Sequence, residues 1–214
     1  PPEGAKVVAY LLDAQTINIK NLITQASTTV SHDAKVDWLE LNGRADLLLF
    51  RDRRRHLHLF SLATQSRSTL LSYCTYVQWV PDSDVVAAQS RGSLCVWYNI
   101  RCSTLSSAAE AGGCTTHDIK GEVVDIERGE GRTEVVVNEG YREATYALDE
   151  ALIRFGGALD DGHFDQAVAI LEPLEMTPES EGMWQQLGRV ALEQGEILVA
   201  GRCAAALGDV CRAR

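Results

Sequence analysis

One short pattern occurs twice near the C-terminal end of this chain, and it limits the possible fold more than any other feature. Small and apolar residues at four positions recur at a constant offset of 33 residues. The four pairs are Gly162 with Gly195, Ala167 with Ala200, Leu171 with Ala204, and Leu174 with Leu207. A fixed period of this length is typical of a repeat in which each unit is a pair of helices.

The residue types at these positions fit two helices that cross closely. Gly188 and Ala200 are small where the helices would approach, and Gly195 is suited to a turn that needs a positive φ. Trp184 and Leu187 are three residues apart, so they share one helix face. The order of these residues is that of the tetratricopeptide (TPR) repeat. Two ordinary amphipathic helices are the alternative interpretation.

Residues 1–150 show the two-residue alternation of strands and a longer repeat of their own. Trp38 and Trp79 stand 41 residues apart in similar surroundings, an interval that suits one four-stranded propeller blade. We predict that they are equivalent core positions of adjacent blades. Trp97 is expected in a later strand of the second of these blades, and Ile126 is expected to take the tryptophan position in the last copy.

Together these patterns predict about 3–4 blades of a partial WD40-type β-propeller over residues 1–150. An all-α TPR-like helical-hairpin solenoid is predicted to begin over residues 151–214. The change from period 2 to period 3.6 places the boundary near Glu150, and we expect residues 149–160 to form a fixed elbow. Because closed propellers have about 4–8 blades, the sequence is expected to be a piece of a longer chain. A β-sandwich is the alternative for the strands.

The charge of the chain argues against some partners. The net charge is −10, and an acidic surface disfavours nucleic acid, whose binding depends on Lys and Arg. The basic run Arg51–His56 is interpreted as a solvated hairpin turn, with a local anion contact as the alternative. His56 and His58 are expected to be exposed polar positions of an alternating strand, not a base or a metal ligand. No stretch has the roughly 20 apolar residues of a transmembrane segment.

The six cysteines form no C-x2-C pair, and free thiols in a reducing compartment are the simplest interpretation. A zinc site at Cys114 and His117, with Cys95 and Cys102 upstream, is disfavoured because only one tight ligand pair is present. The stretch Arg101–His117 has no period and is predicted to be a loop.

No catalytic motif is found in the sequence. The turn Gly129–Arg132 lacks the Lys-Ser/Thr of a phosphate-binding loop, and neither G-x-S-x-G nor H-E-x-x-H occurs. We therefore predict that the protein is not an enzyme and has no cofactor, no metal and no catalytic residue.

Several longer stretches resemble the intraflagellar transport 172 family. These stretches are His32–Asn42, Leu49–Asp52, Tyr76–Pro81, Ser93–Ile100 and Leu174–Glu179. The resemblance covers nearly the whole chain apart from Arg101–His117. It implies the end of a second WD-type propeller and the start of a TPR-like region, in a peripheral subunit of intraflagellar transport complex B.

The resemblance also implies a function. Such a subunit is a scaffold or adaptor of the ciliary train, needed for cilium assembly and maintenance through protein–protein interactions. Its expected partners are other complex B subunits, together with motor or microtubule-associated train components. The expected location is the cilium or flagellum and the basal body, with a cytoplasmic pool. A coat-like subunit of a vesicle-trafficking complex is the alternative, since it shares the propeller-solenoid plan.

Overall fold

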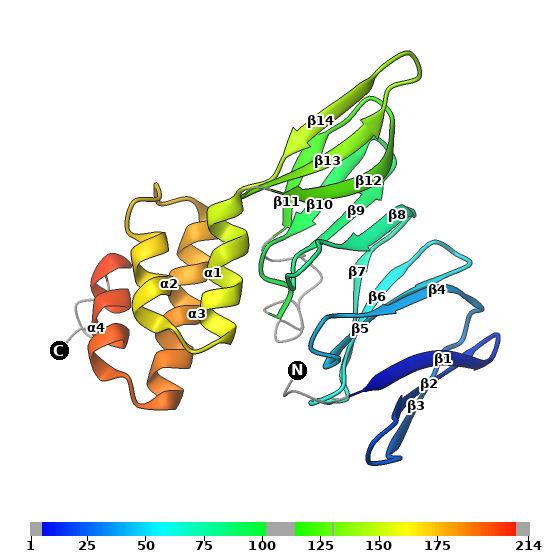
Figure 1. The fold of residues 1–214 in the computed structure, drawn as a ribbon, viewed down its shortest axis with the longest axis horizontal. Helices are drawn as coiled ribbons and strands as arrows, with labels where there is room; N and C mark the ends of the chain where they lie inside the picture. Colours follow the sequence, from blue (N-terminus) through cyan, green and yellow to red (C-terminus); the bar gives the residue numbers. More distant parts are fainter. Residues whose placement is uncertain (1–5, 102–113, 130, 209–214) are drawn as a thin grey trace.

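The computed structural model describes residues 6–101, 114–129 and 131–208. Its strands form four antiparallel sheets in which consecutive strands are neighbours, and four helices lie to one side of them (Figure 1). The first sheet is β1 (Val7–Asp13), β2 (Thr16–Asn21) and β3 (Ser27–Ser31), and the second is β4 (Val36–Leu41), β5 (Leu47–Asp52), β6 (Leu57–Ser61) and β7 (Arg67–Leu71). The third is β8 (Cys74–Trp79), β9 (Val86–Ser90), β10 (Ser93–Trp97) and β11 (Cys114–Asp118), and the fourth is β12 (Glu122–Gly129), β13 (Arg132–Asn138) and β14 (Glu143–Ala147).

The central strands are apolar on both faces because each sheet packs against its neighbours. In β5, Leu48 contributes to an apolar cluster with Ile17 of the first sheet, whereas the next residue, Leu49, contributes to a cluster with Trp97 of the third. Successive side chains of a strand point to opposite faces, so one strand supplies two cores. This row of four meandering sheets agrees with the predicted partial propeller at the level of sheet architecture.

The predicted equivalence of Trp38 and Trp79 is wrong. Matching bulges after the first residue of β4 and of β8 place Trp38 opposite Arg51 and Tyr76 opposite Gln89. The counterpart of Trp38 is therefore Tyr76, 38 residues further along. Trp79 lies three residues after Tyr76 in the same strand. Because side chains alternate between the two faces of a strand, this odd shift places Trp79 on the face opposite to that of Tyr76. Accordingly, Trp38 is half-buried while Trp79 is only 6% exposed.

Ile126 does not take the tryptophan position either. In β12 the bulge lies between Val123 and Asp125, and Ile126 faces Val135. By the same register Ile126 corresponds to Val77 of β8, which faces Ala88. The apolar character of this position is kept, but no tryptophan stands there in the earlier sheets.

Part of the predicted loop Arg101–His117 is a strand. Cys114–Asp118 forms β11, which pairs along β10 so that Cys114 faces Trp97. Residues 102–113 lie outside the described part of the chain, and so does Cys102 of the disfavoured zinc set. The described cysteines are free thiols, as expected: Cys74, Cys95, Cys114 and Cys203.

The basic turn between β5 and β6 is exposed at its tip, at Arg53 to Arg55, as predicted. The prediction for the histidines beside it is wrong for His58, which is 6% exposed. The reason is that β6 is a central strand with every residue buried. His58 therefore lies inside the sheet, close to the buried carboxylate of Asp52.

The helices are α1 (Glu150–Asp160), α2 (Phe164–Leu171), α3 (Pro178–Gln194) and α4 (Ile197–Ala206), paired as α1 with α2 and α3 with α4 (Figure 1). Local sequence explains their ends. Thr177 caps α3 through a reciprocal pair of hydrogen bonds with Ser180, and Gly195 ends it with a φ of 82°. The turn at Gly195 was predicted, because a left-handed turn depends on a few adjacent residues.

One apolar cluster runs from the third and fourth sheets into the helices. It contains Tyr98 from the end of the third sheet, Val135 from β13, Phe155 from α1 and Trp184 from α3. The backbone N–H of Asp149 donates a hydrogen bond of 2.8 Å to the Tyr98 hydroxyl, and the Asp149 carboxylate caps α1. The junction between β14 and α1 is therefore held by apolar packing and by hydrogen bonds.

Candidate interaction cleft

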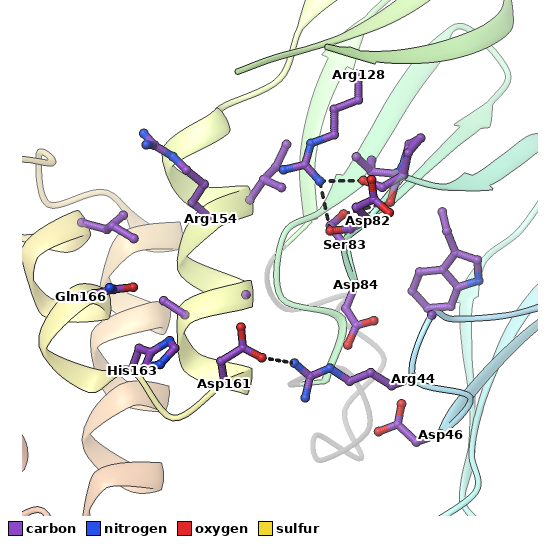
Figure 2. A pocket seen from close by; sticks show the side chains of 18 of the residues that line it. Arg44, Asp46, Asp82, Ser83, Asp84, Arg128, Arg154, Asp161, His163 and Gln166 are labelled. Atoms are coloured by element: carbon purple, nitrogen blue, oxygen red, sulfur yellow. Dashed lines mark hydrogen bonds and ion pairs between the residues drawn. The ribbon is translucent and has the colours of Figure 1, made fainter. Parts of the chain in front are cut away.

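A wide cleft separates the second and third sheets from the helices α1 and α2 (Figure 2). Its volume is about 1550 Å³. One wall is formed by the β4–β5 and β8–β9 turns with the ends of their strands, and the other by one side of the first helical pair. The cleft exists because the strand-to-helix junction holds α1 beside the third sheet.

Apolar side chains lie on both walls of the cleft. Leu41 and Trp79 line it from the ends of β4 and β8, and Ile153 and Ile170 line it from α1 and α2. The indole N–H of Trp79 donates to the backbone carbonyl of Glu40 at 3.5 Å, which connects the second and third sheets at this wall.

An ion pair links the two walls. Arg44, in the β4–β5 turn, donates through Nη2 to Oδ1 of Asp161 at the end of α1, at 3.1 Å (Figure 2). Both side chains are partly exposed to solvent, so the direct contribution of this pair to the free energy of unfolding is expected to be below about 1 kcal/mol. The pair is a direct contact between the two walls of the cleft.

A second arginine joins the two turns of the sheet wall. Arg101 donates to Asp46 at 2.6 Å and to Asp84 at 2.5 Å. Asn42 donates to the same two carboxylates, at 2.7 and 2.8 Å. Burial alone would raise the pKa of Asp46, but the hydrogen bonds from Arg101 and Asn42 hold this pKa below its usual value. The Asp46 carboxylate is therefore ionised at neutral pH and fixed in position.

A third arginine ties the fourth sheet to α1. Arg128 donates to the backbone carbonyls of Pro81 and Asp82, at 2.6 and 3.1 Å, and to the carboxylate of Glu150 at 2.9 Å. The Thr133 hydroxyl donates to the other oxygen of Glu150 at 2.8 Å. Burial would raise the pKa of Glu150, yet these donors lower it overall.

The arrangement of charged and apolar side chains suits the binding of a polypeptide. Arg44 pairs with Asp161 across the cleft, and the lining carboxylates Asp46 and Asp84 pair with Arg101 behind the sheet wall. Leu41 and Ile170, which are half-buried, add apolar surface to the two walls. A surface that alternates fixed charge with apolar side chains can recognise a partner by shape and charge.

The predicted repeat positions are not all brought to this cleft. Trp79 lines it, whereas Trp97 is fully buried within the third sheet. In the helices, Trp184 and Ala200 belong to one apolar cluster, and a Cβ on Gly188 would lie 3.2 Å from Cβ of Cys203 in α4. The cleft residues themselves were not predicted as a group, because the sequence does not show that the β4–β5 turn faces α1.

Comparisons with known proteins identify the class of protein to which this chain is similar. Three curated relatives are intraflagellar transport proteins: those of Chlamydomonas reinhardtii, at 54% identity over 213 residues, of Homo sapiens, at 50% identity over 213 residues, and of Caenorhabditis elegans, at 45% identity over 210 residues. Each alignment covers 98 or 99% of this chain.

The names of these relatives identify one particular protein within that class. The algal relative is named intraflagellar transport protein 172, the human one is its homologue, and the nematode one is intraflagellar transport protein osm-1. Over nearly its whole length, this chain is homologous to one segment of the intraflagellar transport protein 172 family, which confirms the resemblance drawn from the sequence. The chain spans 12% of the length of these relatives.

Other comparisons add little. No protein-family model matches the chain. A solved structure of the dihydro-heme d1 dehydrogenase NirN aligns with 70% of the chain and with 33% of its own chain, at 14% identity and a TM-score of 0.46. None of the four described helices combines the length and the apolar character that crossing a bilayer demands.

Proposed function

We propose that this chain is part of a non-catalytic scaffold subunit of the intraflagellar transport train, in complex B. The observation that carries the proposal is the 44–54% identity to intraflagellar transport proteins in several species. In this interpretation the four sheets are blades of a WD40-type propeller, and the two helical pairs begin a TPR-like solenoid. Residues 1–150 and 151–214 are the two units, and the protein works in the cilium and at the basal body.

The structural support for a scaffold is the fixed junction between strands and helices. The bond from Asp149 to Tyr98, the Arg128–Glu150 pair and the shared apolar cluster all act at this junction. A rigid elbow would hold two binding surfaces at a constant angle, as an assembly unit requires. We propose that the cleft beside the elbow receives another subunit of the train.

The elbow is tested in cells that lack the endogenous protein. The full-length protein without the segment that corresponds to residues 151–208 should fail to restore cilium assembly. The undeleted full-length protein is the control and should restore normal cilia. Normal cilia with the deletion would refute the scaffold model. Vesicle-transport defects with normal cilia would favour the alternative, a coat-like trafficking subunit.

The cleft is tested separately by charge exchange at Arg44 and Asp161. Either single reversal, Arg44→Asp or Asp161→Arg, should reduce the recovery of train subunits that co-purify with the full-length protein. The double exchange restores the ion pair with opposite polarity and should restore most of that recovery. Unchanged recovery in both single variants would show that this contact between the two walls is irrelevant to assembly.

A further inference from the structure

A buried cluster of metal-ligating side chains lies inside the second sheet, away from the cleft. His32 comes from the connection between β3 and β4, Asp52 from the end of β5, and His58 from β6. One ligand atom from each of the three lies within 4.8 Å of the others. All three are buried, with exposed fractions of 8%, 2% and 6% in that order. His56, at the solvent side, approaches the same carboxylate.

The contacts within the cluster are long for hydrogen bonds, and one ring nitrogen has no hydrogen-bond partner among the described residues. Oδ2 of Asp52 faces Nε2 of His32 at 3.3 Å, Nδ1 of His56 at 3.4 Å and Nε2 of His58 at 3.6 Å. Nε2 of His58 is buried and has no hydrogen-bond partner within the described chain. A buried polar atom without a partner costs about 1–3 kcal/mol, so a group that could satisfy it would be stabilising.

These distances are the ones that a four-coordinate cation requires. Metal bonds of about 2.0–2.1 Å in a tetrahedral zinc site separate the ligand atoms by roughly 3.3–3.4 Å. The separations from the Asp52 oxygen are 3.3 and 3.6 Å for the two buried histidines. Because all three ligand atoms lie within 4.8 Å of one another, a small inward movement of the two histidines would bring two nitrogens and one oxygen around one point.

The outer partners of the histidines are also present. Nδ1 of His58 lies 3.1 Å from the Thr69 hydroxyl, and Nδ1 of His32 lies 3.2 Å from a carboxylate oxygen of Asp33. A metal-bound histidine usually donates its second N–H to such a hydroxyl or carboxylate, which fixes the ring. The backbone N–H of His56 donates to the second oxygen of Asp52 at 2.9 Å and orients that carboxylate in the same way.

We propose that His32, Asp52 and His58 bind one Zn²⁺ ion, with His56 in the fourth position. Imidazole nitrogens with one carboxylate form a donor set that suits Zn²⁺. The side chain of His56 is 38% exposed and marks the route by which the ion enters. The bound ion would join the β3–β4 connection to β5 and β6, so its role is structural.

The metal-free interpretation is a hydrogen-bond network that holds no ion. In that network Arg67 donates to Nδ1 of His32 at 2.8 Å, so that Nε2 of His32 carries the proton and donates to Asp52. Zinc binding requires the opposite tautomer, in which His32 donates from Nδ1 to Asp33 and Arg67 moves away from the ring. The two interpretations therefore make different predictions for metal uptake.

The test is a titration of the whole chain after chelator treatment and dialysis. Isothermal calorimetry with Zn²⁺ should give one ion per chain. Co²⁺ should produce the visible absorption of a four-coordinate site and should be displaced by Zn²⁺. Zn²⁺ should also raise the midpoint of thermal unfolding. The background is a Cys95→Ala/Cys114→Ala variant, which removes thiols able to bind the same ions.

The variants separate the cluster from other sites. His58→Phe should weaken Zn²⁺ binding on the order of 100-fold or more and abolish the thermal shift, and phenylalanine fills the same space beside Phe50. His163→Asn, at an exposed histidine far from the cluster, should bind like the parent chain. If His58→Phe does not fold, His56→Ala should weaken binding about tenfold without a change in the buried packing.

Three results would overturn the proposal. One is the absence of stoichiometric uptake together with identical unfolding in zinc and in chelator. Another is uptake that disappears only because the two cysteines were replaced. The last is wild-type affinity in His58→Phe. Any of these leaves the cluster as a hydrogen-bond network, and none bears on the proposed scaffold function.

Discussion

The side chain of His58 shows how burial and charge act together on one residue. Burial lowers its pKa to about 4, and the neighbouring His32 acts in the same direction. For Asp52, burial alone would raise the pKa, but hydrogen bonds from the backbone of His56 and from His32 and His56 lower it to about 2. At neutral pH the cluster therefore holds a neutral His58 beside an ionised Asp52.

These pKa values predict how the free energy of unfolding depends on pH in chelator-treated protein. Between about pH 6.5 and about pH 4, the unfolded chain binds a proton at His58 that the folded chain excludes. The free energy of unfolding should therefore fall by about 3 kcal/mol as the pH falls through this range. A second loss should follow below about pH 4 as Asp52 is protonated. Urea unfolding at a series of pH values measures both.

The variant His58→Phe identifies the residue responsible. It should show no loss from this residue between pH 6.5 and pH 4, because phenylalanine has no proton to bind, while His163→Asn should keep the parent slope. An unchanged slope in His58→Phe would mean that His58 has an ordinary pKa and is not buried as described.

The residues that could be predicted from the sequence are those whose roles depend on nearby residues. Gly195 and Thr177 are such cases, because a left-handed turn and a helix cap are decided within one helical turn. His58 could not be predicted in this way. The alternation Leu57-His58-Leu59 suggested an exposed face, but the first sheet covers that face, and this contact is not local in sequence.

At the scale of one element, α3 contains two glycines in different environments. A Cβ on Gly182 would meet no atom within 4 Å, whereas one on Gly188 would lie 3.2 Å from Cβ of Cys203. Gly182→Ala should raise the free energy of unfolding by about 0.5–1 kcal/mol, because alanine is the better helix former. Gly188→Leu should lower it by about 1–3 kcal/mol, because α4 must move away. Thermal and urea unfolding compare the two, and equal effects would contradict the close crossing of α3 and α4.

The start of α3 gives a second prediction at this scale. Thr177 accepts a hydrogen bond from the backbone N–H of Ser180, and Ser180 accepts one from the backbone N–H of Thr177. Thr177→Ala should cost about 1 kcal/mol in free energy of unfolding. Thr177→Ser keeps the hydroxyl and should lose much less. Equal losses in both variants would show that the hydroxyl does not cap the helix.

Strand existence was more predictable than strand register. The alternation and the turns indicated strands in each of the four sheets, although not every strand of each. The match of Trp38 to Trp79 failed because a bulge in each first strand shifts the alternation. A bulge leaves little trace in a single sequence. The strand β11 was missed for a related reason: its Cys-Thr-Thr-His-Asp sequence is polar, and only its pairing with β10 makes it a strand.

At the scale of the whole molecule, the described chain contains three apolar clusters. One joins the first and second sheets, one joins the second and third, and the largest joins the third and fourth sheets to all four helices. The sequence indicated a boundary near Glu150 from the change of period. It could not show that the apolar core continues across this boundary, because that depends on long-range contacts such as those of Tyr98 with the start of α1.

A continuous core predicts that strands and helices on either side of the boundary lose stability together. Phe155 of α1 is 1% exposed and belongs to the largest cluster, so Phe155→Ala should cost about 3–5 kcal/mol. Hydrogen exchange should then accelerate in β10 and in α3 alike. The control is Leu48→Ala, a buried change in the cluster of the first and second sheets, which should accelerate exchange mainly in β2 and β5. If Phe155→Ala weakens protection in the helices alone, the helices fold independently and the elbow is a flexible hinge, which would remove the structural basis of the scaffold proposal.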